Sequence, residues 1–165
     1  MARAPPAGTL LSEPTRRSVR MPDPVPIRLL VADDDEPARV LLAASAREIG
    51  GEIAVLEAED GAEAVQLSLQ ERPEIALLDV SMPRLGGIET ALTLRELQPR
   101  IRVALRTGDP LTHSERARQE LLPLFGKLEL EDTLAWLHAQ VERVVRAEPG
   151  PSVPRKHDLV CGACG

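Results

Sequence analysis

A chain of 165 residues with a net charge of -6 is long enough for one domain with a buried core, and its acidity argues against a broad nucleic-acid footprint. Phe125 and Trp136 are its only aromatic residues, so platforms that stack bases or sugars are not expected. No stretch approaches the roughly 20 apolar residues of a membrane span, and no apolar segment of a signal peptide follows the N-terminal arginines. We therefore expect a cytoplasmic protein without membrane insertion.

The composition divides the chain into three parts. Residues 1–26 are rich in proline and arginine and lack apolar periodicity, which predicts a disordered extension. Residues 148–165 have the same character and are expected to form a flexible tail. Residues 27–147 are expected to form one globular domain, which leaves no room in this sequence for a DNA-binding output domain.

The C-terminal tail holds one group of candidate metal ligands. His157, Cys161 and Cys164 form an H-x3-C-x2-C pattern, whose C-x2-C spacing suits a zinc knuckle. A structural zinc site takes four ligands, and only three are evident here. A flexible tail with two reduced thiols is the simpler interpretation; a metal shared between two chains, or a redox pair, is the alternative.

Strand and helix signals alternate from residue 27 onward. Short, mostly apolar runs predict parallel strands at residues 27–32, 53–58, 74–78, 101–105 and 124–127. Helices are expected to begin near residues 36, 61, 88, 113 and 130. Asp60 is placed to cap the second of them, with Glu63 in position for a capping-box contact. Five β–α repeats predict an α/β fold with a doubly wound parallel sheet.

Charged residues stand at the ends of three of these strands. Asp33 and Asp34 follow the first strand, Asp79 follows the third, and Lys127 ends the fifth. Ligands of such folds bind beyond the carboxyl ends of the strands, so we expect these four residues to lie together. Clustered carboxylates repel one another unless a cation binds, and a neighbouring lysine suggests a phosphoryl group as the visiting anion.

Lysine occurs in this arginine-rich chain only at positions 127 and 156, which makes Lys127 more informative. Simpler interpretations exist for each residue alone. An acidic run such as Asp33–Asp35 often only caps a helix, and a single Thr107 or Lys127 often has no special role.

Four segments in order resemble the receiver domains of bacterial two-component response regulators, the CheY-like family. They are Val31–Arg39, Leu77–Pro83 with Gly86-Gly87, Leu105–Gly108 and Phe125–Lys127. The resemblance covers about residues 27–147. It implies a flavodoxin-like (βα)5 fold with a five-stranded parallel sheet in the order 2-1-3-4-5.

The resemblance also implies a role for each matching acid. Asp79 would be the phosphoacceptor. Asp34 and Asp79 would bind Mg²⁺ directly, together with the backbone carbonyl of Ser81, and Asp33 would act through a metal-bound water. Such a ligand set meets the demand of Mg²⁺ for octahedral oxygen ligands with retained waters.

Thr107 and Lys127 would contact the transferred phosphoryl group in this family. The implied function is a stand-alone response regulator that accepts a phosphoryl group from a histidine kinase or phosphotransfer protein onto Asp79. It would then switch contacts with a downstream protein, and it would be no enzyme beyond its own phosphoryl transfer and dephosphorylation.

Several residues depart from the family pattern. Leu128 follows Lys127 where proline after a cis bond is usual; a cis bond before leucine costs about 3–4 kcal/mol, so we expect a trans bond or a local shift of the loop. Leu124 replaces an aromatic residue that moves on activation, unless Phe125 substitutes for it. Arg106 replaces an apolar residue and is expected to pair with an acid or to face a partner.

These departures keep an alternative open: a receiver-like module that binds proteins without phosphorylation. A small Mg²⁺-dependent phosphatase is a third and weaker hypothesis, because the second position after Asp79 is Ser81 rather than an aspartate.

Overall fold

A single parallel sheet carries the site, and its strands end level with one another. The computed structural model describes residues 25–50 and 52–147. Across this part of the chain the sheet has five strands in the order β2-β1-β3-β4-β5. They are β1 (Ile27–Ala32), β2 (Ile53–Ala58), β3 (Ile75–Asp79), β4 (Arg102–Thr107) and β5 (Leu124–Gly126). The predicted fold class and strand order are confirmed.

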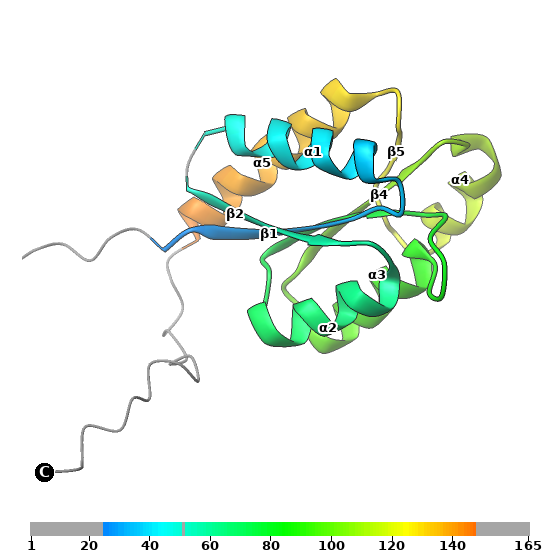
Figure 1. Ribbon diagram of the computed structural model, residues 1–165, viewed down its shortest axis with the longest axis horizontal. Coiled ribbons are helices and arrows are strands. Elements are labelled where there is room, and N and C mark those ends of the chain that lie inside the picture. Colours follow the sequence, from blue (N-terminus) through cyan, green and yellow to red (C-terminus); the bar gives the residue numbers. More distant parts are fainter. Residues whose placement is uncertain (1–24, 51, 148–165) are drawn as a thin grey trace, which may run out of the picture.

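Helices cover both faces of the sheet, as Figure 1 shows. They are α1 (Glu36–Glu48), α2 (Gly61–Glu71), α3 (Gly87–Leu97), α4 (Pro110–Gln119) and α5 (Leu130–Arg146). In Figure 1, α1 and α5 lie above the sheet, and α2 and α3 lie below it. None of the described helices is both long and apolar enough to span a membrane.

Alternation along the strands divides the core into two layers. On β1, Leu30 packs with the α2 and α3 side chains, whereas Leu29 packs with those of α1 and α5. The side chains of Leu78 and Leu77 on β3 separate in the same way. All four are buried, as expected for a strand covered on both faces. Both faces are therefore sealed, and only the strand ends are left to carry a polar site.

Successive side chains of β5 also point to opposite faces of the sheet, which decides whether Phe125 can substitute for an aromatic residue at position 124. Leu124 packs against the layer that contains α2 and α3, whereas Phe125 packs in the layer of α1 and α5. The ring of Phe125 lies 6.2 Å from that of Trp136 on α5. Phe125 therefore faces away from Leu124 and cannot replace it on that face.

The start of α4 and one capping contact of α2 differ from the sequence-based prediction. The fourth helix begins at Pro110 rather than near residue 113, because Asp109 caps it by accepting the N–H of Thr112 and proline suits the first turn. Asp60 caps α2 as predicted, accepting the N–H groups of Ala62 and Glu63. The capping-box contact is shifted by one residue, since the carboxylate of Glu63 accepts the N–H of Glu59.

The predicted terminal extensions, residues 1–26 and 148–165, lie outside the described residues, except that the description begins at residue 25. The same holds for the candidate metal ligands His157, Cys161 and Cys164.

Candidate functional site

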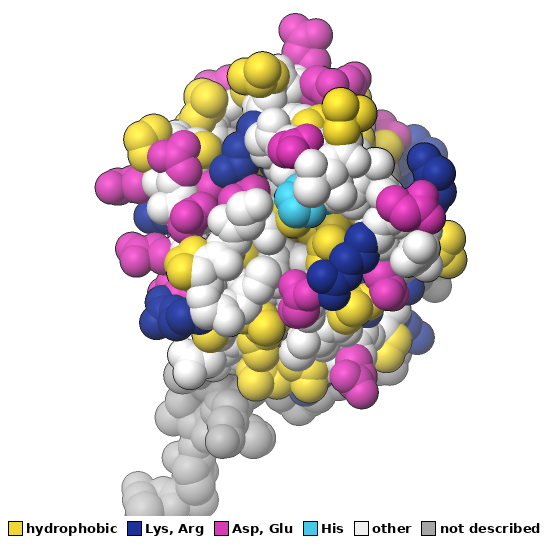
Figure 2. Space-filling model, turned by 90° about the vertical axis from the view of Figure 1, so that its right-hand side faces the viewer, with side chains coloured by type: hydrophobic (Ala, Val, Ile, Leu, Met, Phe, Trp, Pro, Cys, Tyr) yellow, Lys and Arg dark blue, Asp and Glu magenta, His cyan; other side chains and the backbone are white. Residues whose placement is uncertain are grey.

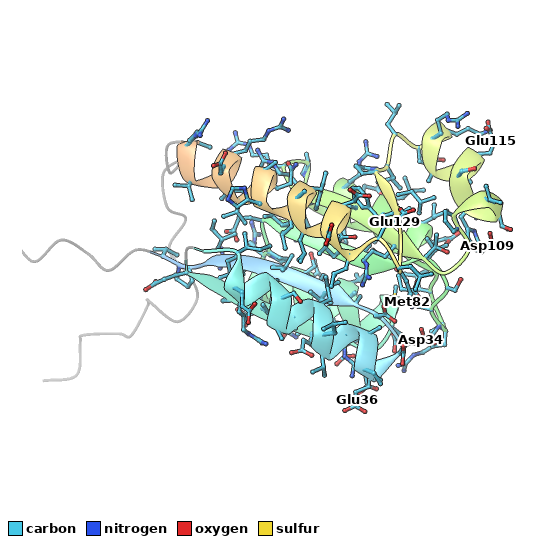
Figure 3. All side chains as sticks on the ribbon, turned by 90° about the horizontal axis from the view of Figure 1, so that it is seen from above. Asp34, Glu36, Met82, Asp109, Glu115 and Glu129 are labelled. Carbon is cyan, nitrogen blue, oxygen red and sulfur yellow. The ribbon has the colours of Figure 1, made fainter. Side chains whose placement is uncertain are left out.

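Three carboxylates meet at the carboxyl edge of the sheet. The register pairs Ala32 of β1 with Leu78 of β3, which sets Asp33 level with Asp79 on the neighbouring strand. Carboxylate oxygens of Asp33, Asp34 and Asp79 lie within 4.8 Å of one another. Asp33 and Asp79 are buried and Asp34 is exposed, so the cluster opens to solvent on one side. In Figure 3, Asp34 lies at the same end of the sheet as Met82 and Asp109.

Lys127 joins this cluster from the end of β5. Its Nζ donates to Oδ1 of Asp33 at 2.9 Å and lies 3.2 Å from Oδ2 of Asp79. Burial lowers the pKa of Lys127, but the hydrogen bond to Asp33 and the charge of Asp79 outweigh burial and raise it. Lys127 is therefore a firmly charged ammonium that bridges two buried carboxylates.

One oxygen of the buried carboxylate of Asp79 lacks a hydrogen-bond donor among the described residues. Burial raises the pKa of Asp79, the charge of Asp33 raises it further, and Lys127 lowers it. Its Oδ1 is buried and accepts no hydrogen bond from any residue in the described part of the chain. A buried charged oxygen without a donor is costly, so Asp79 is poised to gain an electropositive neighbour.

The donor set fits a hard divalent cation. Three carboxylates supply oxygen ligands, two of them from adjacent residues of one strand end and one from the next strand. Mg²⁺ prefers oxygen ligands and keeps several waters, which the exposed side of Asp34 would admit. The unpartnered Oδ1 of Asp79 is the atom that such an ion would satisfy.

Two further predicted site residues, Thr107 and Ser81, lie at the end of β4 and in the loop after β3. Thr107 ends β4 and is almost fully buried; its Oγ1 accepts the N–H of Asp109 at 3.1 Å, which leaves the hydroxyl proton available for donation. Ser81 is exposed in the loop that follows β3. In that loop Arg84 pairs with the buried carboxylate of Asp60, which ties the loop to the start of α2.

The backbone around Asp79 is packed too tightly for any side chain at position 87. A Cβ on Gly87 would collide with the carbonyl of Asp79, so the first turn of α3 lies directly against the end of β3. The N–H of Gly87 donates to the carbonyl of Val80 at 3.0 Å. Glycine at this position lets the helix approach and fix the loop beside Asp79.

Two arginines at the site were missed or left undecided by the sequence analysis. Arg39 of α1 is buried and donates to the backbone carbonyl of Asp33 at 2.7 Å, which fixes the turn after β1. Arg106 of β4 is buried and donates to the backbone carbonyl of Lys127 at 3.0 Å. Burial lowers the pKa of Arg106, and the charges of Asp33 and Asp79 raise it. Arg39 ends the segment Val31–Arg39 that carries the family resemblance, but the sequence alone gave it no role.

The surface around the strand ends carries both charges. Figure 2 faces this side of the molecule, where acidic and basic side chains are interspersed with hydrophobic ones. Leu128, directly after Lys127, is fully exposed. The bond between Lys127 and Leu128 is trans, in agreement with the expectation from the missing proline.

Comparison with known proteins agrees with this geometry. Residues 29–120 match the family model of the response regulator receiver domain. The response regulator MprA of Mycobacterium sp. (strain KMS) is 32% identical over 135 residues, which cover 79% of this chain and 56% of that protein. The transcriptional regulatory protein PdtaR of Mycobacterium tuberculosis is 48% identical over 67 residues, or 41% of this chain and 32% of that protein. The chain thus spans about a third to a half of the length of these curated relatives.

Solved structures with the same fold include two receiver domains. The receiver domain of AraT from Geobacillus stearothermophilus superposes with a TM-score of 0.62 at 25% identity, covering 74% of this chain and all of that one. The signal receiver domain of the putative response regulator NarL from Mycobacterium tuberculosis gives a TM-score of 0.61 at 28% identity, covering 75% of this chain and 99% of that one.

Proposed function

Because the chain belongs to the response regulator receiver domain family, we propose that Asp79 accepts a phosphoryl group from the phosphohistidine of a histidine kinase or phosphotransfer protein. The observation that carries the proposal is the state of Asp79. Its carboxylate is buried, one oxygen has no donor among the described residues, and Lys127 approaches the other at 3.2 Å. A nucleophilic oxygen and a cation are thereby held at the same strand ends.

In the proposed step a carboxylate oxygen of Asp79 forms a bond to phosphorus while the bond from phosphorus to the histidine nitrogen breaks. The leaving nitrogen keeps the electron pair and takes a proton from water. Such transfers require little covalent assistance and much neutralisation of charge. The ammonium of Lys127 would leave its ion pair with Asp79 and bind an oxygen of the phosphoryl group. The hydroxyl of Thr107 would donate to another phosphoryl oxygen.

The three clustered carboxylates would hold Mg²⁺. Asp34 and Asp79 would be direct ligands, the backbone carbonyl of Ser81 a third, and Asp33 would act through water. The ion would neutralise the repulsion among these groups and the charge on the phosphoryl oxygens. The spacing of the oxygens, within 4.8 Å, and the opening at Asp34 support this assignment.

The proposed output is a change in protein contacts made by residues 27–147 acting as the receiver domain. In this role the chain catalyses only its own phosphorylation and dephosphorylation. The alternative, a module that binds proteins without phosphorylation, is favoured by one observation: the exposed Leu128 directly beside Lys127, which a protein partner would cover.

The proposal is tested by incubating the chain with Mg²⁺ and acetyl phosphate and measuring its intact mass. We expect the gain of one phosphoryl group by the parent and none by Asp79→Asn. Asp35→Asn is the matched control, because Asp35 is an exposed neighbour whose side chain makes no capping contact. A parent that gains no mass, or a gain that persists in Asp79→Asn, overturns the proposal; the first result favours the phosphorylation-independent module.

A further inference from the structure

The position of Lys127 depends on a short stretch of backbone. β5 has only three residues and ends at Gly126, directly before Lys127. The next residue, Leu128, is fully exposed and cannot anchor the chain by packing. The Nζ of Lys127 nevertheless lies 2.9 Å from Asp33 and 3.2 Å from Asp79. A defined backbone at Lys127 is needed to aim this flexible side chain.

Two consecutive residues of β4 hold that backbone from both sides. The N–H of Lys127 donates to the carbonyl of Thr107 at 2.8 Å. The carbonyl of Lys127 accepts from Nη2 of Arg106 at 3.0 Å. The contacts of Glu129 fix the preceding residue instead, since its N–H and its carboxylate both bind the backbone of Gly126. Arg106 is thus the group that holds the carbonyl of Lys127.

Arg106 is buried and has few polar partners, so its hydrogen bond to the carbonyl of Lys127 matters for the stability of its buried charge. Its side chain is only 5% exposed, and its Nε finds no hydrogen-bond acceptor within the described ranges. No carboxylate of these ranges lies within ion-pair distance of it, although the charges of Asp33 and Asp79 act on it from further away. A buried cation costs more than an apolar residue of similar size. The bond to Lys127 and the nearby negative charge offset that cost.

We propose that Arg106 is a positioning residue of the phosphoryl site, which aims Lys127 at the acidic cluster by holding its peptide carbonyl. The consequence for phosphoryl transfer rests on the proposed function of Asp79. The hydrogen bond from Arg106 to the carbonyl of Lys127, which we call the clamp, does not rest on it, because this bond exists in the unphosphorylated protein. Arg106 contacts neither the phosphoryl group nor the metal in this account; it acts through Lys127.

The clamp is tested by amide hydrogen exchange of the unphosphorylated, metal-free protein. We compare the amide of Lys127 with that of Leu105, which donates to Pro123 at 2.8 Å further back on the same pair of strands. In Arg106→Met we expect exchange at Lys127 to rise about tenfold relative to Leu105, as the loss of one charge-assisted hydrogen bond implies. Arg102→Met is the matched control on the same strand, and it should leave the ratio unchanged.

Arg106→Lys distinguishes the effect of the hydrogen bond to the carbonyl of Lys127 from the effect of the positive charge at position 106. Lysine keeps the positive charge but has a shorter reach and no planar fork, so the exchange ratio should rise in this variant too. If Arg106→Met does not fold, Arg106→Lys decides the question by the same ratio. An unchanged ratio, or an equal rise at Leu105 and Lys127, overturns the proposal, because the residue would then have no local effect or only a general one.

Phosphorylation supplies the second readout. With acetyl phosphate at saturating Mg²⁺, the rate should fall about tenfold in Arg106→Met, while Mg²⁺ binding measured by calorimetry should not weaken, since a positive charge near the carboxylates has been removed. A rate equal to that of the parent overturns the positioning role. If the parent itself takes no phosphoryl group, the proposed function fails, and the exchange ratio still decides whether the clamp exists.

Discussion

Replacing Asp79 by asparagine removes one charge from a site that holds more negative than positive charge at close range. Oxygens of Asp33 and Asp34 lie no more than 4.8 Å from the carboxylate of Asp79, and the ammonium of Lys127 lies 3.2 Å from it. The carboxylate is also buried, so water screens these interactions only in part. We expect Asp79→Asn to be more stable than the parent when no divalent cation is present.

The distances set the size of this effect. At an effective dielectric constant of about 20, each of the two repulsions amounts to about 3.5 kcal/mol or more, and the attraction to Lys127 to about 5 kcal/mol. The repulsions exceed the attraction by about 2 kcal/mol, and burial of the charged oxygen adds to the difference. The free energy of unfolding of Asp79→Asn in EDTA should therefore exceed that of the parent by about 2 kcal/mol or more.

The assay is urea unfolding followed by the fluorescence of Trp136, the only tryptophan, with and without Mg²⁺. Mg²⁺ should stabilise the parent more than Asp79→Asn, because the variant has lost a charged ligand. Asp35→Asn serves as the control and should behave as the parent does. The reasoning is refuted if Asp79→Asn is less stable than the parent in EDTA, or if Mg²⁺ stabilises both proteins equally.

Three further predictions concern the same strand ends. Because the pKa of Asp79 is raised, the native state keeps the proton of Asp79 to higher pH than the unfolded chain does, so the stability of the metal-free parent should fall as pH rises from about 4 through the native pKa. In urea titrations at several pH values, the extra stability of Asp79→Asn over the parent should disappear below about pH 4. Lys127→Met leaves buried Asp33 and Asp79 without their cation, so the free energy of unfolding in EDTA should fall by about 2–4 kcal/mol, and Mg²⁺ should restore most of it. Equal losses in EDTA and in Mg²⁺ would contradict the bridging role of Lys127. Gly87→Ala forces a methyl group against the carbonyl of Asp79 and should lower the free energy of unfolding by about 1–3 kcal/mol, whereas Gly108→Ala, which has open space around it, should lower it much less. Equal losses in the two variants would contradict the close packing at Gly87.

Periodicity and order along the chain were sufficient to predict the fold. Apolar runs alternating with helical segments lead to a parallel sheet covered on both faces, and the observed strands begin and end within two residues of the predicted ones. The meeting of Asp33, Asp34 and Asp79 with Lys127 also followed from sequence, because parallel strands carry whatever follows them to the same edge.

The ends of elements were less predictable where side chains compete for the same backbone groups. Asp109 and Pro110 start α4 earlier than its apolar pattern indicates, since the cap and not the periodicity sets the first turn. Glu63 reaches the N–H of Glu59 rather than that of Asp60, a choice between neighbours that the local sequence does not encode.

The sequence by itself determined which charged groups meet, because strand order and strand length place them at one edge of the sheet. Only the tertiary structure decided how they are held there. Arg106 could have paired with an acid or faced a partner, and its bond to the carbonyl of Lys127 depends on the register of β4 against β5. Phe125 likewise had two faces open to it, and the pleat of β5 places it beside Trp136. A pattern along the chain records which residues are near a strand end, whereas contacts across strands depend on register and facing, which exist only once the sheet has formed.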